Sequence, residues 1–299
     1  MFNRILAGLK GSVASILLAA NVLLIALSMV PFALLKLLLP WPPVRKFTDR
    51  VLNRLAEQWS IFNGWWIAAM QNIRWDIAGV DTLHRRGWYL VSSNHQSWVD
   101  ILVLQKVFLR RIPLLKFFLK RELIYVPVIG LAWWALDFPF MRRGKGSRSS
   151  KTDFAATRKA CERFKLIPTS VINFLEGTRF SEAKKSKQRS PYRHLLKPRI
   201  GGLSIALGTM GEQFEAMLDV TIIYPQGVPT FWDLLSGKVR EIVVRVEEIK
   251  IPADLLAGDY ENDSAFRGRM QAWVQQMWDE KDRKIEAWLA NSANKAPAR

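Results

Sequence analysis

One of the three histidines in this chain has a neighbour suited to acid–base chemistry. His95 follows the strand-like stretch WYLVSSN and precedes Asp100 by five residues. A histidine can accept a proton near neutral pH, and a carboxylate on its second ring nitrogen fixes the tautomer and stabilises the imidazolium. Five residues do not bring two side chains together on a straight helix, but the pair can face each other across a strand-to-helix turn. We predict that His95 is a general base oriented by Asp100; the alternative is a turn histidine that caps the helix.

Two further strand ends carry groups that could hold an anion. Glu176, Gly177, Thr178 and Arg179 follow one apolar run, and Arg143 follows another in the stretch FMRRGKG. Glycine permits a tight turn whose N–H groups can face an anion, and arginine offers a two-pronged donor for phosphate. The alternative is an ordinary strand-to-loop turn with a surface arginine. The sequence has no phosphate-binding P-loop and no Gly-x-Gly-x-x-Gly motif.

Charge and composition restrict the class of partner. The 299 residues include 44 Lys and Arg against 26 Asp and Glu, a net charge of +18. Residues 142–199 hold 17 basic and four acidic side chains, so +13 of that charge is local. Such a balance predicts an anionic partner, which can be nucleic acid, anionic lipid or a phosphorylated small molecule. The single cysteine, Cys161, excludes an intramolecular disulfide and a cysteine-rich zinc site.

An uncharged run near the N-terminus predicts contact with a membrane. Residues 11–35 lack charged side chains, and about 20 apolar residues suffice to cross the hydrocarbon core. The run is too long for a secretory signal. Two basic residues precede it and five follow it before residue 55, which by the positive-inside rule places the rest of the chain in the cytoplasm. The alternatives are a buried core helix and a re-entrant hairpin kinked at Pro31.

The remaining pattern predicts an α/β fold. Residues 44–75 read as a second helix, whose aromatic second half suits either the lipid headgroup level or a protein core. Strands are expected at residues 88–92, 138–141, 170–175, 220–224 and 241–246, and helices near 98–110, 149–166, 203–213 and 262–290. This alternation indicates a largely parallel mixed sheet flanked by helices. We expect a membrane-anchoring part at residues 1–75, an α/β part with a C-terminal helix at 76–299, and a mobile loop at 179–198.

No residue pattern supplies a covalent nucleophile or a metal site. There is no Gly-x-Ser-x-Gly elbow, Cys161 lies within an expected helix, and no His, Cys and carboxylate cluster has metal-ligand spacing. An oriented histidine, phosphate receptors at strand ends and a membrane segment therefore favour direct attack by a hydroxyl on an activated acyl group. We expect no metal, no cofactor and no covalent enzyme intermediate.

Four ordered segments resemble the motifs of the lysophosphatidic acid acyltransferase family. They are NHQSWVD at 94–100, FMRR at 140–143, FLEGTR at 174–179 and LDVTIIYP at 218–225. The stretches LLKPRIGGL and VREIVVRVEEIKIP look closer to the lysophospholipid and lysocardiolipin acyltransferase branch. The chain departs from the family pattern at Asp137, Leu175 and residues 219–221, where the family often has glycine, proline and a proline-bearing motif.

The resemblance implies a fold like that of glycerol-phosphate acyltransferases and a role in phospholipid synthesis. The acyl group would pass from acyl-CoA or acyl carrier protein to the free hydroxyl of a lysophospholipid, foremost 1-acylglycerol-3-phosphate, giving phosphatidic acid. By resemblance His95 is the base and Asp100 its orienter, while the acceptor phosphate is held by Arg143, Glu176, Gly177, Thr178 and Arg179. The enzyme would sit in a membrane, the inner membrane in a bacterium, with its active site facing the cytoplasm.

Three other hypotheses stay open at this point. The acceptor can be another lysophospholipid, such as lysophosphatidylglycerol or lysocardiolipin. The basic stretch would also suit a nucleic-acid-binding protein, although the apolar segment and the absence of a nucleic-acid fold argue against nucleic acid as a partner. A non-catalytic lipid-binding protein would use the same charge and tryptophans.

Overall fold

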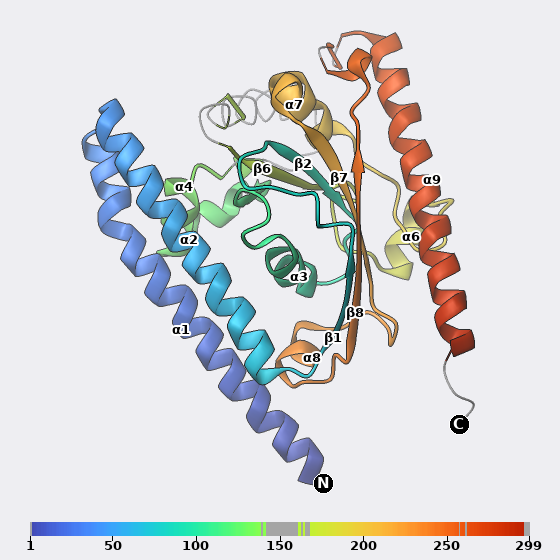
Figure 1. Cartoon of the computed structure of the whole chain (residues 1–299), viewed down its shortest axis with the longest axis horizontal. Coiled ribbons are helices and arrows are strands. Elements are labelled where there is room, and N and C mark those ends of the chain that lie inside the picture. Colours follow the sequence, from blue (N-terminus) through green and yellow to red (C-terminus); the bar gives the residue numbers. More distant parts are fainter. Residues whose placement is uncertain are drawn as a thin grey trace.

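The computed structural model describes residues 2–138, 140–141, 161–162, 164, 168–256, 258–260 and 262–295. Two long helices come first, α1 (Phe2–Leu38) and α2 (Pro42–Met70), and form a hairpin beside an α/β unit (Figure 1). Prolines at the start of α2 suit its first turn, where no N–H partner is needed. α1 runs through Pro31 without interruption, so the chain reverses after residue 38 and not at Pro31.

A mixed sheet of six strands forms the centre of the α/β unit. Its order is β1-β8-β7-β2-β6-β3, and every neighbouring pair is parallel except β7 and β8. The strands are β1 (Arg74–Ala78), β2 (Tyr89–Ser93), β3 (Leu115–Phe117), β6 (Ser170–Phe174), β7 (Ala216–Ile223) and β8 (Glu241–Ile249). The predicted fold class, a largely parallel mixed sheet flanked by helices, is confirmed.

Alternate residues of the strands enter two different cores. Val91 packs with α2 and with α3 (Val99–Phe108), whereas Leu90 packs on the opposite side with α7 (Gly201–Met210) and α9 (Ser264–Lys295). Figure 1 shows the two groups of helices on opposite faces of the sheet. Because both faces are covered, β2 and β7 are buried along their whole length, which is typical of parallel strands.

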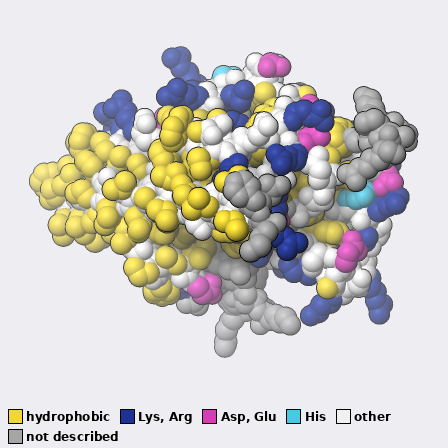
Figure 2. Space-filling view, turned by 90° about the horizontal axis from the view of Figure 1, so that it is seen from below, with side chains coloured by type: hydrophobic (Ala, Val, Ile, Leu, Met, Phe, Trp, Pro, Cys, Tyr) yellow, Lys and Arg dark blue, Asp and Glu magenta, His cyan; other side chains and the backbone are white. Residues whose placement is uncertain are grey.

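A third apolar cluster joins the hairpin to α4 (Ile129–Ala135). Ala26 and Met29 of α1 and Leu52 of α2 pack there against Ala132. The outward face of α1 carries exposed leucines and isoleucines, and Figure 2 shows a broad hydrophobic surface. α1 contains a stretch, Arg4–Leu38, that is long and apolar enough to cross a membrane.

The smaller elements complete the chain. They are β4 (Leu119–Lys120) paired with β5 (Phe140–Met141), α6 (Glu182–Gln188), α8 (Phe231–Leu235) and the short 3-10 turns η1 (Arg121–Tyr125), η2 (Gly211–Gln213) and η3 (Ala253–Leu255).

Several predicted boundaries differ from the structure for identifiable reasons. The second helix ends at Met70 and not at residue 75, because residues 74–78 form edge strand β1 against β8. The predicted strand 138–141 shrinks to β5, which pairs with β4 outside the main sheet. The predicted loop 179–198 contains α6, whose first turn is capped by the Ser181 hydroxyl. The predicted helix 149–166 lies mostly outside the described residues.

Candidate active site

His95 and Asp100 face each other across the turn between β2 and α3. His95 Nδ1 lies 2.9 Å from Asp100 Oδ2. Because a carboxylate only accepts hydrogen bonds, this contact assigns the proton to Nδ1 and leaves the lone pair on Nε2. Asp100 is fully buried, whereas the His95 side chain keeps 13% of its surface exposed. The pair therefore has the arrangement of a general base with its orienting carboxylate.

Three further donors hold Asp100 in place. The backbone N–H groups of Gln96 and Ser97 donate to Oδ2 at 2.6 and 2.9 Å. The hydroxyl of Tyr224, which follows β7, donates to Oδ1 at 2.6 Å. Burial and the Asp100 charge raise the pKa of Tyr224 well above its usual value, so the phenol remains a donor. The carboxylate thus has one orientation that satisfies all of its partners.

The loop that carries His95 is tied to the neighbouring strand and turn. Asn94 exchanges two hydrogen bonds with the backbone of Ile222 on β7, at 2.9 and 2.8 Å. Ser97 Oγ donates to the carbonyl of Pro229 at 2.6 Å. The imidazole itself stacks on Phe174 at the end of β6, with ring centroids 3.9 Å apart. These contacts fix both the backbone and the ring plane of His95.

Glu176 was predicted to bind phosphate, but the structure places its side chain away from the cavity. Its side chain is fully buried, and its two oxygens accept the backbone N–H groups of His95 and Leu196 at 2.7 and 3.0 Å. Burial raises the pKa of Glu176 to about 7, against the opposing effect of these two hydrogen bonds. The side chain therefore supports the His95 loop from behind and does not line the cavity described below.

The turn after Glu176 places three of the predicted residues together beside the histidine. Gly177 has a φ of 65°, and a Cβ there would meet Arg199 Cδ at 2.8 Å, so only glycine fits without strain. Lys184 Nζ, from α6, donates to Thr178 Oγ1 at 2.9 Å and to the carbonyl of Arg179 at 2.7 Å. The Arg179 guanidinium lies 4.6 Å from the ring centroid of Trp98. A compact cationic turn results.

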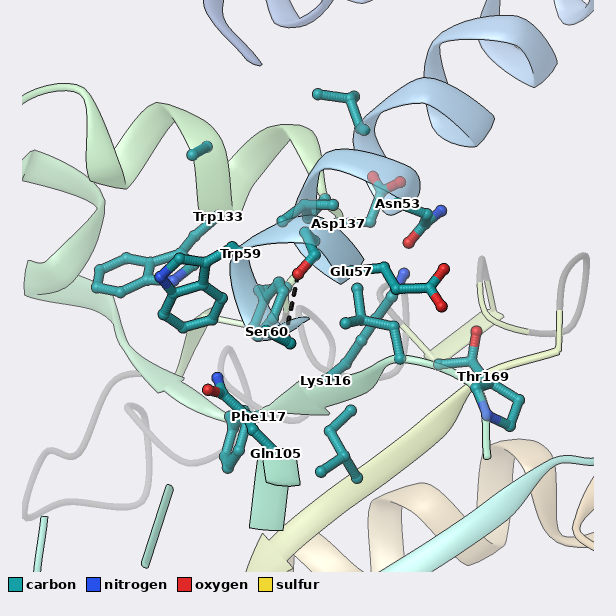
Figure 3. Close-up of a pocket in the computed structure, with 18 of the residues that line it drawn as sticks. Asn53, Glu57, Trp59, Ser60, Gln105, Lys116, Phe117, Trp133, Asp137 and Thr169 are labelled. Carbon is teal, nitrogen blue, oxygen red and sulfur yellow. Dashed lines mark hydrogen bonds between the residues drawn. The ribbon is translucent and has the colours of Figure 1, made fainter. Parts of the chain in front are cut away.

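A cavity of about 1700 Å³ opens at this turn and continues beneath α2. His95, Trp98, Gly177, Thr178 and Arg179 line it at one end, and apolar side chains of α1, α2 and α4 line much of the rest. Figure 3 shows part of this lining, to which α2 contributes Asn53, Glu57, Trp59 and Ser60. The cavity is large enough for a lipid-sized ligand, and its apolar lining suits acyl chains.

Lys116 is a buried cation that the sequence reasoning missed. It lies on β3 and lines the cavity, with Nζ 4.4 Å from the ring centroid of Phe164. Burial lowers the pKa of Lys116 to about 8. A lysine within the apolar stretch LLKFFL was the available signal. Its charge can face an anionic group of a bound molecule.

Two other functional candidates were also missed. Tyr224 stands in the fourth ordered segment, LDVTIIYP, but its contact with Asp100 could not be predicted, because 124 residues separate the two. Lys184 was hidden within a basic stretch in which many residues looked alike. Arg143, a predicted phosphate ligand, lies outside the described residues. Among the residues that are described, no three His, Cys, Asp or Glu side chains are close enough to share a metal ion.

Comparison with known proteins gives similarities over most of the chain. A family model described as acyltransferase matches residues 74–225. Lysocardiolipin acyltransferase 1 of Danio rerio is 28% identical over 216 residues, covering 66% of this chain and 51% of that protein. The 1-acyl-sn-glycerol-3-phosphate acyltransferase gamma of Mus musculus is 28% identical over 297 residues, covering 93% and 74% of the two chains. The chain thus spans about half to three quarters of these relatives.

Similarity also extends to a solved structure. It is the crystal structure of the 1-acyl-sn-glycerophosphate acyltransferase PlsC from Thermotoga maritima, with 19% identity and a TM-score of 0.49 over 93% of this chain and 98% of that one. The family model alone covers more than half of the 299 residues and includes both His95 and the 177–179 turn. This chain belongs to the acyltransferase family.

Proposed function

We propose that this protein is a membrane-bound phospholipid-synthesis enzyme that transfers an acyl chain from a thioester to the free hydroxyl of a lysophospholipid. The donor is acyl-CoA or acyl carrier protein, and the foremost acceptor is 1-acylglycerol-3-phosphate, which gives phosphatidic acid. The observation that carries the proposal is the His95–Asp100 pair beside a cationic turn at the end of an apolar cavity. The names of the curated relatives agree with this reaction class.

The mechanism assigns each step to a group in the site. His95 Nε2 takes the proton of the acceptor hydroxyl, whose oxygen attacks the thioester carbonyl carbon. As the tetrahedral intermediate collapses, the carbon–sulfur bond breaks and the thiolate receives the proton from His95. Asp100 stabilises the imidazolium formed in between. No covalent intermediate with the protein is needed.

The cationic turn positions the acceptor. Gly177, Thr178 and Arg179 offer a backbone turn, a hydroxyl and a guanidinium within the cavity lining, and Lys184 adds a further charge. We retain Arg143 as a fourth phosphate ligand from the sequence prediction. Glu176 serves this site by positioning the His95 backbone. Holding the hydroxyl against the base can lower a barrier by roughly 7 to 11 kcal/mol in favourable cases.

The helical hairpin is the proposed membrane anchor, with residues 1–75 as the anchoring part and 76–299 as the catalytic part. α1 is long, apolar and mostly exposed, and exposed leucines on its surface would face lipid. Basic residues follow the apolar run on the side of the catalytic part, so we place the active site on the cytoplasmic face. The cavity then opens beside the membrane that contains the lysophospholipid acceptor.

Lysocardiolipin or lysophosphatidylglycerol is the second candidate acceptor. The similarity to a lysocardiolipin acyltransferase favours it. The test is a panel in which purified protein receives labelled oleoyl-CoA or oleoyl-acyl carrier protein and each lysophospholipid in turn. We expect the highest kcat/KM with lysophosphatidic acid. Transfer to none of the acceptors from either donor would contradict the proposed function.

A further inference from the structure

A surplus of positive charge lines the cavity beneath the first half of α2. Between positions 45 and 57 of α2, seven residues that line the cavity are polar or charged: Arg45, Lys46, Asp49, Arg50, Asn53, Arg54 and Glu57. Spacings of three and four arrange them in two adjacent rows on the side of the helix that lines the cavity. Arg85, from the loop before β2, and Arg110, after α3, line the same region. Six cations therefore meet two carboxylates of α2 in this part of the lining.

Only some of these cations are paired. Glu57 accepts a hydrogen bond from Arg85 at 2.8 Å and lies 3.6 Å from Arg110. Within the described part of the chain, no carboxylate lies within ion-pair distance of the exposed side chains of Lys46, Arg50 and Arg54. Three unpaired cations on one rim of a cavity create a local positive potential that attracts an anionic ligand.

The backbone at Arg110 adds an independent observation. Arg110 has a φ of 61°, in the left-handed region that glycine normally occupies just after a helix. A residue with a side chain is strained there, and such strain concentrates at binding sites. Glycine would relieve the strain but would remove a side chain that is 63% exposed at the rim of the cavity.

These cations lie too far from His95 to serve the acceptor phosphate. The side chain of Asn63 on α2 donates to Gln105 of α3 at 3.3 Å, and Glu57 lies 3.6 Å from Arg110, so α2 runs antiparallel to α3 and its earlier residues lie farther from His95. On α2, which ends at Met70, Arg54 precedes Asn63 by nine residues and Arg50 precedes it by 13. At 1.5 Å per residue, Arg54 lies about 14 Å farther along the helix, and Arg50 about 20 Å. The phosphate of a lysophospholipid is only a few bonds from its reacting hydroxyl.

We propose that Lys46, Arg50, Arg54 and Arg110, here called the α2 rim, bind the phosphates of coenzyme A when the acyl donor is acyl-CoA. The inference rests on the proposed function, because it places the thioester at His95. The long pantetheine arm would follow the cavity, so that the thioester and the phosphates occupy its two ends. Several cations suit the several phosphates of coenzyme A better than the single phosphate of a carrier-protein arm.

The test compares Arg50→Gln/Arg54→Gln with Arg240→Gln/Lys250→Gln. The control pair removes the same charge from exposed residues at the two ends of β8, away from the cavity lining. All proteins are full length, in detergent micelles free of phospholipid. We expect the Kd for free coenzyme A, measured by calorimetry, to rise at least about tenfold in the rim variant and to stay unchanged in the control.

Kinetics provide the second measurement. The KM for oleoyl-CoA should rise in the rim variant, whereas the KM values for oleoyl-pantetheine, which lacks phosphate, and for lysophosphatidic acid should not. Equal effects on both thioesters, an unchanged Kd for coenzyme A, or turnover with acyl carrier protein alone would overturn the inference. So would a variant that loses only its binding to phosphatidylglycerol vesicles, because the rim would then be a lipid headgroup site. If wild type binds coenzyme A through these arginines but transfers no acyl group, the proposed function fails and the rim assignment stands.

Discussion

Replacing Tyr224 by phenylalanine removes a single hydroxyl from the surroundings of Asp100. That hydroxyl donates to Oδ1 at 2.6 Å, and both residues are buried. Phenylalanine keeps the ring and its packing, so the change is confined to one hydrogen bond. Asp100 then keeps three contacts, all of them on Oδ2. One oxygen is left without its donor, and the carboxylate is then held through Oδ2 alone.

The expected losses of activity and stability follow from the type of hydrogen bond that is removed. A hydrogen bond to a charged group contributes about 1.5 to 3 kcal/mol. Because the Oδ2 contacts still hold Asp100, we expect the activation free energy of acyl transfer to rise by the lower end of that range. About 1.4 kcal/mol corresponds to a tenfold loss of kcat. The free energy of unfolding should fall by a similar amount, since the free oxygen is buried.

The assay measures kcat and KM for oleoyl transfer together with unfolding in denaturant. Tyr192→Phe is the matched control, because Tyr192 is also a buried tyrosine beside a carboxylate but lies on the opposite side of the sheet. Burial and the Asp279 carboxylate raise the pKa of Tyr192 to about 12. The control should lose stability but keep kcat, and neither variant should change KM. If Tyr224→Phe loses stability while its kcat matches wild type, Tyr224 does not position the catalytic pair and the reasoning is refuted.

Three further predictions concern buried charges. Burial raises the pKa of Glu176 from 4.5 to about 7, so its contribution to stability is complete below pH 4.5 and is lost as the pH rises through 7. The free energy of unfolding of wild type, measured in urea, should therefore fall by roughly 3 kcal/mol between pH 4.5 and pH 8. Glu176→Gln should not show this fall. Lys116 has its pKa lowered to about 8, so wild type should gain stability from pH 8 to 10.5, a gain that unfolding of Lys116→Met should lack. Lys36 is buried, with Nζ 2.7 Å from both Asp49 and Asp137; Lys36→Met should lower the free energy of unfolding by about 3 kcal/mol, and an unchanged denaturation midpoint would contradict this role.

The sequence predicted the elements whose pattern is strong and local. β2, β6, β7 and β8 are apolar runs, since helices cover both faces of the sheet, and each was expected close to its observed place. β1 was missed because an edge strand of five half-exposed residues has no clear alternation. β3 is three residues long and gains its hydrogen bonds from β6, which local sequence does not reveal.

The site could be predicted only where its residues are close in sequence. His95 and Asp100 lie within one turn, and Gly177 in the sequence predicts the 177–179 turn. The direction of the Glu176 side chain depends on Leu196, 20 residues away, so the motif alone suggested the wrong environment. Asp137, where the family often has glycine, has a φ of 58°, which explains the preference, and it pairs with Lys36 from 101 residues earlier.

The central claim is that His95 is the base in acyl transfer to a lysophospholipid. The most direct measurement is transfer from labelled oleoyl-CoA to lysophosphatidic acid by wild type and His95→Ala in matched detergent preparations. We predict product with wild type and a loss of at least about a hundredfold in kcat with the variant, which should still unfold cooperatively, at a lower midpoint because Asp100 loses a donor. A folded His95→Ala protein that transfers oleate as fast as wild type would contradict the account.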